Sequence, residues 1–406
     1  MRSTVAHTTA AVLITAAVHA PTTVVDTTQT RTVVVTRGKR THTIRTDITR
    51  IRTPATATDS TNLSAFGSAG RFVSTHFRTL ADRRMALRLT TDAVICSPTH
   101  IYHADWGTDP KKRWLARAKL GSDGRYTPEA PHPVGDHTQL ITSIRTEIGS
   151  EDCALVGFDF PIGVPERYAS AAGIGEFKSF LLGLGTGAWA DFFNCARLSA
   201  EISVHRPFYP FRPGGTKQAH VLTALGLQEI DDLRRQCERK QNGRRAACAL
   251  FWTLGANQVG KGAIVGWRDV LAPALRADKN VALWPFDGRL NELFQPGRIV
   301  IAETYPAECY GWFFSEPLRG KGKLEVRKGV GIHSLSWAIN RGVELAGALR
   351  REIEAGFPEG DDAFDAVVGL FGMIEVVTGR RQAGDLSENR IRKLEGWILG
   401  QPVRRI

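Results

Sequence analysis

Acidic residues stand at the ends of three apolar segments and at the start of a fourth. Asp105, Asp159 and Glu303 each close an apolar run, while Asp362 and Asp365 lie three residues apart. A spacing of three puts two side chains on the same face of a helix. Carboxylates that converge repel one another unless they are protonated or share a cation. The acids therefore predict a common site for a cation.

Side-chain oxygens of this kind favour hard divalent ions, so the expected cofactor is Mg²⁺ or Mn²⁺. Two such ions held about 4 Å apart by carboxylates can activate a water molecule and stabilise the leaving oxygen of a phosphodiester. The sequence thus indicates metal-assisted hydrolysis of a phosphodiester bond as the reaction class.

Each acid also has a simpler interpretation. Asp362 could complement the start of a helix, and Glu303 could pair with an arginine. Asp105 could belong to a turn that ends at Gly107. Asp159 lies between two phenylalanines and is the hardest to explain in this way, because an unpaired buried carboxylate is strongly destabilising.

Basic and aromatic residues in the middle of the chain suit contact with a nucleic acid. Residues 206–217 mix cations with aromatic rings, which favours stacking on unpaired bases, although a proline-rich loop packed by its own rings is equally compatible. Residues 255–261 match the first seven positions of a phosphate-binding P-loop, but Gly262 replaces the hydroxyl residue that would hold Mg²⁺. The residues expected to contact substrate phosphates are Arg206, Lys217 and Lys261.

Apolar patterns place the acids at the carboxyl ends of sheet strands, where sites form in open α/β sheets. Residues 153–160 form a continuous apolar run, which is typical of a strand buried on both faces. Residues 165–290 are expected to form a helical insertion, with helices near 229–239 and 259–270, and His333 lies in a loop-like segment. The remaining elements are expected as strands at 99–107, 113–120, 124–131 and 298–304 and as helices at 138–148 and 361–377.

The positive charge is concentrated at the amino-terminal end. The chain carries a formal net charge of +12 at pH 7, but residues 1–84 hold twelve Lys and Arg against four acids. The rest of the chain is nearly balanced, so basicity says little about its partner. The Thr/Arg-rich composition predicts a disordered extension over residues 1–85, with Met85 as a better start. A signal or transit peptide is the less favoured alternative.

Cysteine spacing and hydropathy narrow the class of protein. The six cysteines form no Cys-x-x-Cys pair, which is typical of reduced thiols in the cytoplasm. No apolar run approaches the roughly 18 residues that a membrane span needs. We expect a cytoplasmic protein without a membrane partner.

Several segments after residue 95 resemble one protein family. The opening HADWGTDPKKRWLARAKL, the segment FDFPIGVP and the closing DDAFDAVVGLFGMIEVVTGR look like the family described as domain of unknown function 429. The middle segments RPFYPFRPGGTK, LFWTLGANQVGKGAIVGW, WPFDG and AETYPAE are similar to the same family. Its members are regarded as predicted nucleases with a ribonuclease H-like fold. The resemblance implies such a domain over residues 86–406: a mixed sheet flanked by helices, with an insertion near 165–290.

The resemblance also implies roles for the acids. Asp105, Asp159 and Asp365 would bind the metal, with Asp362 or Glu303 completing the set, and Asp105, Asp159, Glu303 and Asp365 would form the catalytic group. The substrate would be DNA or RNA, and resolvase-like relatives suggest a homodimer. Two alternatives stay open: a nucleotide-binding phosphotransferase or ATPase that shares the sheet core, and a non-catalytic nucleic-acid-binding module.

Overall fold

The chain divides into two compact units, Met1–Arg84 and Met85–Ile406. The computed structural model describes residues 31–37, 40–46, 97–214, 216–241, 244–255, 259–314 and 318–403. In the first unit, β1 (Arg31–Arg37) pairs antiparallel with β2 (Arg40–Thr46). The composition of residues 1–85 does not predict this hairpin, and the rest of the predicted extension lies outside the described residues.

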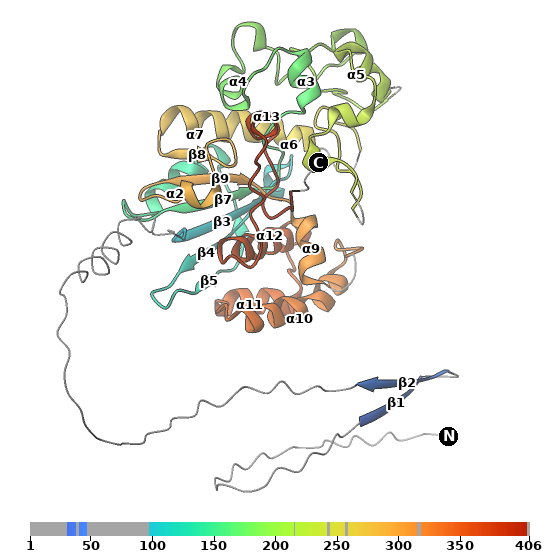
Figure 1. Cartoon of the computed structure of the whole chain (residues 1–406), viewed down its shortest axis with the longest axis vertical. Helices are drawn as coiled ribbons and strands as arrows, with labels where there is room; N and C mark the ends of the chain where they lie inside the picture. Colours follow the sequence, from blue (N-terminus) through green and yellow to red (C-terminus); the bar gives the residue numbers. More distant parts are fainter. Residues whose placement is uncertain are drawn as a thin grey trace, which may run out of the picture. The chain divides into compact units, whose positions relative to one another are not determined.

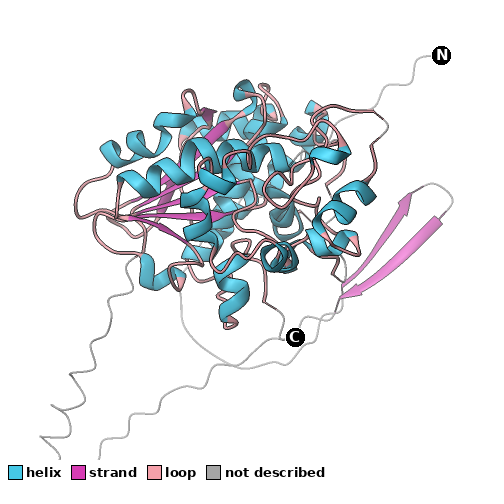
Figure 2. Cartoon of the chain, turned by 90° about the horizontal axis from the view of Figure 1, so that it is seen from above, coloured by secondary structure: helices cyan, strands magenta, loops and turns pink. Residues whose placement is uncertain are grey.

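A seven-stranded mixed sheet forms the centre of the second unit (Figures 1 and 2). Its strand order is β5-β4-β3-β7-β9-β8, and β6 also pairs with β4. The β3 strand is antiparallel to β4 and parallel to β7, and β9 is parallel to β7 and β8. The strands are β3 (His100–Asp105), β4 (Trp114–Leu120), β5 (Tyr126–Pro128), β6 (His132–Pro133), β7 (Ala154–Phe158), β8 (Val281–Leu283) and β9 (Ile299–Glu303).

Helices cover both faces of this sheet, as the apolar strands require. Every residue of β7 and β9 is buried, and alternate side chains enter different cores. Val156 and Phe158 join the core beneath α2, whereas Leu155 joins the core beneath α12. Figure 1 shows α9 to α12 gathered on one side of the sheet and α7 on the other. The prediction of a mixed α/β sheet flanked by helices is confirmed.

Most of the described helices are short, and two are long: α10 (Leu324–Arg341) with 18 residues and α12 (Asp361–Val377) with 17. The α12 helix has the bounds expected from the sequence, and fourteen of its seventeen residues are buried, which leaves Asp361 and Asp362 at its more accessible start. The helices are α2 (Leu140–Glu147), α3 (Glu166–Ala171), α4 (Phe177–Gly183), α5 (Gln218–Leu225), α6 (Val259–Val265), α7 (Ala272–Ala277), α8 (Leu290–Leu293), α9 (Pro306–Phe313), α10 (Leu324–Arg341), α11 (Gly347–Ala355), α12 (Asp361–Val377) and α13 (Asn389–Leu394). Short 3₁₀ turns add η1 (Pro110–Lys112), η2 (His137–Gln139), η3 (Gly187–Trp189), η4 (Ser199–Glu201), η5 (Ile230–Leu233) and η6 (Gln236–Glu238).

The region between β7 and β9 departs from the sequence prediction in three places. It includes β8, which pairs with β9 in the main sheet, so the predicted insertion at 165–290 overruns into the sheet. The helix expected near 229–239 is instead the two 3₁₀ turns η5 and η6. The helix expected over 259–270 begins as α6 but continues as the π-helix Gly266–Leu271. Outside this region, His333 lies within α10 and not in a loop.

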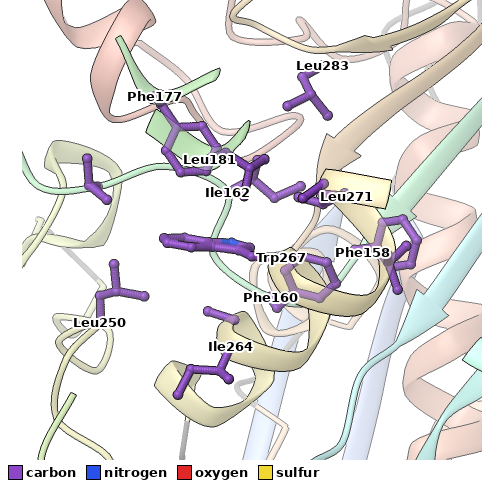
Figure 3. Packing of buried hydrophobic residues seen from close by; sticks show 14 of the residues in the cluster. Phe158, Phe160, Ile162, Phe177, Leu181, Leu250, Ile264, Trp267, Leu271 and Leu283 are labelled. Atoms are coloured by element: carbon purple, nitrogen blue, oxygen red, sulfur yellow. The ribbon is translucent and has the colours of Figure 1, made fainter. Parts of the chain in front are cut away.

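Aromatic packing ties the segment after β7 to the π-helix. The Trp267 side chain is fully buried, and its indole N–H donates to the Pro161 carbonyl at 2.7 Å. Figure 3 shows this ring among the side chains of Phe160, Ile162 and Leu250. A buried indole with its N–H satisfied fixes the backbone that it holds. The chain that leaves Asp159 is therefore fixed from one side of the sheet.

Candidate active site

A cavity of about 560 Å³ lies where β3, β7 and β9 end, and acids dominate its polar lining. It is bounded by the β3–β4 connection, the start of α9, the loop before α10 and the first turn of α12. All five acids singled out from the sequence line this cavity, together with two others, Glu238 and Asp361. The five are Asp105, Asp159, Glu303, Asp362 and Asp365.

Two neighbouring parallel strands bring Asp105 and Asp159 together. In the register of β3 and β7, Ala104 lies opposite Phe158, and the Asp159 amide donates to the Ala104 carbonyl at 3.1 Å. Asp105 is only 7% exposed. Within the described residues, no donor lies at hydrogen-bond distance from the carboxylate of either aspartate. The buried carboxylate of Asp105 and the half-buried carboxylate of Asp159 thus face one cavity without hydrogen-bond partners from the described residues. The free energy lost when a carboxylate is buried is normally regained by an ion pair or a bound metal.

Close packing of α12 against β3 delivers Asp365 to the same cavity. His103 on β3 is fully buried; its Nδ1–H donates to the Ala366 carbonyl at 2.9 Å, and its Nε2 accepts from the Thr304 hydroxyl at 2.9 Å. Gly369 makes this approach possible, because a Cβ atom there would lie 2.1 Å from the His103 ring. Asp365 lies one helical turn before Gly369, so the contact sets how close its carboxylate comes to the strand ends.

Asp365 differs from its neighbours in having two protein donors. The Tyr310 hydroxyl donates to one carboxylate oxygen, and the Lys321 ammonium donates to the other. Lys321 also lies 3.6 Å from the carboxylate of Asp361. The N-cap of α12 is Gly360 and no side chain caps the helix. Asp361 and Asp362 therefore complement the helix dipole without capping it.

Glu303 forms an ion pair with an arginine, as the simpler interpretation of its sequence position predicted. Both of its oxygens accept from the Arg235 guanidinium at 2.6 Å, and one also accepts from the Ile162 amide at 2.7 Å. Arg235 is fully buried and also donates to Glu238. These bonds favour a positioning role for Glu303, beside the cavity and not as a free metal ligand; its predicted catalytic role stays a prediction.

Burial and mutual repulsion raise the pKa values of the acids. The pKa of Asp159 rises to about 8, because burial disfavours its charge and Asp365 repels it. Burial, and then repulsion by Asp365, hold the pKa of Asp105 well above its usual range. Burial also raises the pKa of Asp365, against the opposing attraction of Lys321. Without a cation the cluster keeps protons that ordinary aspartates lose, which is the expected behaviour of crowded carboxylates.

The side-chain oxygens of the cavity are of the chemical kind that a hard divalent ion prefers, but they are not grouped in a metal-binding geometry. Carboxylate oxygens are the ligands that Mg²⁺ and Mn²⁺ prefer, and Asp105 and Asp159 have oxygens that accept from no donor within the described residues. Across the described part of the chain, however, no group of three or more His, Cys, Asp or Glu side chains is arranged so that it could hold a metal ion. Lys321 and Tyr310 both donate to Asp365, the carboxylate that would complete the set. The residues that fit as ligands are Asp105, Asp159 and, after release from Lys321, Asp365, with Asp362 at the rim.

The three predicted phosphate-binding residues do not share one location. Arg206 and Lys261 line a second cavity beside the acidic one, whereas Lys217 is exposed at the start of α5 and lies outside both. The guanidinium of Arg206 is occupied by the carbonyls of Asn194 and Cys195, each at 3.1 Å. Residues 256–258 of the P-loop-like segment lie outside the described residues. Of the three, Lys261 is the best placed to contact a substrate phosphate.

Sequence reasoning missed three residues that shape the site: Lys321, Tyr310 and Arg235. Each acts on an acid far away in the chain, so local spacing gives no signal for the pairing. The only feature of the sequence that could have indicated Lys321 is its place between two glycines in residues 319–323, because glycines allow a lysine-bearing loop to approach a carboxylate closely.

Comparison with protein-family models, with curated proteins and with solved structures gives no match to this chain. Among the described helices, none has the length and apolar character to cross a membrane.

Proposed function

We propose that this protein is a metal-dependent nuclease that hydrolyses phosphodiester bonds at the acidic cavity. The observation that carries the proposal is the pair Asp105 and Asp159, whose carboxylates face the cavity without a donor from any described residue. Such a pair is costly to maintain for stability alone. Its retention at the carboxyl ends of adjacent parallel strands supports a role in binding a cation and its substrate.

The sheet order supports a ribonuclease H-like fold as the finer description. Three antiparallel strands, β5, β4 and β3, are followed in space by the parallel strands β7 and β9. In this arrangement β3 ends in Asp105, Asp159 directly follows β7, and α12 adds Asp365. The family of domain of unknown function 429 remains the proposed relative on the motifs alone.

The residues of the site would have two kinds of role: some would bind the cation, and others stabilise or orient the carboxylates. Asp105, Asp159 and Asp365 would hold Mg²⁺ or Mn²⁺, with Asp362 at the rim. A bound divalent ion would supply a lowered pKa for an attacking water and charge stabilisation for the leaving oxygen. Lys321 stabilises the ionised form of Asp365, and Tyr310 orients that carboxylate through its hydroxyl. Glu303 is fixed by Arg235 and in turn fixes the Ile162 amide, which steadies the segment after Asp159.

The first prediction tests this assignment by replacing one carboxylate. Asp159→Asn keeps the size of the side chain but removes the charge, so we expect metal-dependent cleavage of single-stranded and duplex DNA and RNA to be abolished. Mn²⁺ binding by calorimetry should weaken at least about tenfold, because a ligand oxygen is lost. Asp123→Asn, in an exposed turn, is the matched control and should retain both properties.

Two outcomes would contradict the proposal in different ways. Full cleavage by a folded Asp159→Asn protein would remove the metal assignment. Absence of Mn²⁺ binding to the wild-type chain at millimolar concentration would point instead to a non-catalytic binding module. Thermal melts of both variants show whether the fold is retained.

A further inference from the structure

A second cavity of about 630 Å³ lies beside the acidic one and has the opposite charge. Thr108 lines both cavities, and Lys261 of the second is adjacent in sequence to Gly262 of the first. No acidic residue is among those that line it. We call it the basic groove, and its cationic and aromatic side chains are Phe193, Arg197, Arg206, Phe211, Arg212 and Lys261.

The cations of the basic groove fall into two kinds. Arg206 is part of the wall: its guanidinium donates to two backbone carbonyls and lies 3.5 Å from Glu201. Arg197, Arg212 and Lys261 differ, because none of them makes an ion pair with an acid of the described chain. Glu201 still attracts Arg197 electrostatically, whereas Arg212 and Lys261 have no acid paired with them among the described residues, and cations gathered in one concave surface attract a polyanion. The wall is therefore rigid, while its charge remains available to a ligand.

An exposed aromatic ring lies among these cations. The Phe211 side chain is 41% exposed, and the guanidinium carbons of Arg197 and Arg212 lie 5.1 and 5.6 Å from its ring centroid. Phenylalanine rings and guanidinium planes both stack on nucleobases, whatever the base. An acidic peptide would use the cations but would leave the ring without a matching partner. The combination thus favours a ligand that carries both flat apolar faces and negative charge.

We propose that the basic groove binds an unpaired segment of a nucleic-acid strand, with one base stacked against Phe211 and phosphates contacted by Arg212 and Lys261. The acidic cavity has little positive charge to attract phosphates unless a cation is bound, so the adjoining groove supplies the attraction. The assignment of this segment as the substrate strand leading to the acidic cavity rests on the proposed nuclease function. The preference for an unpaired segment does not, because the faces of a paired base are already covered by its neighbours in the duplex.

Binding without cleavage tests the groove separately from the chemistry. The full chain is titrated in EDTA against labelled oligonucleotides of about 15 nucleotides, as single-stranded DNA, single-stranded RNA and blunt duplex, by fluorescence anisotropy. We expect single strands to bind at least about tenfold more tightly than the duplex. Phe211→Ala should weaken single-strand binding about tenfold, and Phe211→Trp should restore it, because stacking needs a ring at this position.

Salt dependence tests the phosphate contacts. Arg212→Gln and Lys261→Gln should each lower the slope of log affinity against log salt by about one, as expected when one phosphate contact is lost. Arg351→Gln, an exposed residue of α11 outside both cavities, is the matched control and should change nothing. All variants keep the basic residues 1–84, so non-specific attraction by that stretch is the same throughout.

The outcomes separate the groove from the nuclease. Equal affinity for single strand and duplex, an unchanged affinity after Phe211→Ala, or tighter binding of an acidic peptide of equal charge would each overturn the groove. Groove binding that survives while no metal-dependent cleavage is found would overturn the nuclease and leave the groove standing. Cleavage that depends on Asp159 but not on Phe211, Arg212 or Lys261 would leave the nuclease standing and overturn the assignment of the groove as the path of the substrate strand.

Discussion

The Lys321 ammonium lies in the acidic cavity, where a divalent ion would compete with it for the Asp365 carboxylate. Its ammonium donates to Asp365 and lies close to Asp361. The loop that carries it is held from behind, because the buried Arg327 guanidinium donates to the Lys321 carbonyl at 2.6 Å. Burial lowers the pKa of Lys321, but the attraction of Asp365 outweighs it and the pKa lies above its usual value. The lysine is therefore a fixed positive charge that any bound metal must displace or share with Asp365.

Replacement of this lysine should strengthen metal binding. In Lys321→Met the ammonium no longer competes for Asp365, and we expect the Mn²⁺ dissociation constant measured by calorimetry to fall about tenfold. Lys323→Met, two residues further on and exposed, is the control and should leave the constant unchanged. A weaker constant in Lys321→Met would mean that the lysine holds Asp365 in its binding position instead of competing for it.

At the scale of single residues, the sequence identifies the acids but not their partners. Asp105 and Asp159 are predictable because each follows an apolar run, and Asp159, which lies between two phenylalanines, has no local structural use. Lys321 and Asp365 lie 44 residues apart, and only tertiary packing brings them together. The sequence allows Glu303 to pair with an arginine, but no pattern in it identifies Arg235 as that partner.

At the scale of elements, one buried arginine links the 3₁₀ turns to the end of β9. Arg235 bonds to Glu303 and Glu238 and donates to the carbonyls of Ile162 and Glu395. Removing one partner of a buried pair leaves a charge without compensation, which destabilises by about 3–5 kcal/mol. We expect Arg235→Met to lower the free energy of unfolding by that amount in urea titrations.

Two further variants make the Arg235 measurement specific. Arg167→Met removes an arginine that is 71% exposed and 3.8 Å from Asp232, and exposed pairs of this kind contribute less than about 1 kcal/mol. The double variant Arg235→Met with Glu303→Gln should recover only part of the lost stability, because Glu303 no longer carries an unpaired charge while buried Glu238 still lacks its arginine. A loss in Arg235→Met no larger than in Arg167→Met would show that the buried network is not what holds the turns to the sheet.

The strands and α12 were predictable, whereas α10 and the 3₁₀ turns of the middle region were not. Buried parallel strands are continuous apolar runs, so β7 and β9 stand out from the sequence. The α10 helix was missed because Gly329 and Gly331 give its start the character of a loop. Gly331 is instead a packing residue, since a Cβ atom there would lie 2.7 Å from the Ile353 carbonyl of α11. Short 3₁₀ turns have no periodicity of their own to detect.

At the scale of the whole molecule, the acidic cavity opposes folding when no cation is bound. Asp159 loses its proton near its usual pKa of 3.8 in the unfolded chain but at about 8 in the folded protein. A group whose folded pKa is raised contributes its full stability below the unfolded pKa and loses it as the pH rises through the folded pKa. His103 works the other way: burial lowers its pKa to about 4, so it destabilises the fold as the pH falls below 6.5. The two effects overlap and are separable only by comparing variants that share His103.

The difference in stability between Asp159→Asn and the wild type isolates the cost of the acidic site. In EDTA, both proteins carry the same His103, so we expect the variant to gain about 1–3 kcal/mol over the wild type between about pH 5 and about pH 8, measured by urea denaturation. Mn²⁺ at about a hundredfold over its dissociation constant should add about 2.7 kcal/mol to the wild type and much less to the variant. Parallel pH profiles for the two proteins would mean that Asp159 ionises as an ordinary surface aspartate. The crowding that links this residue to a cation would then be absent.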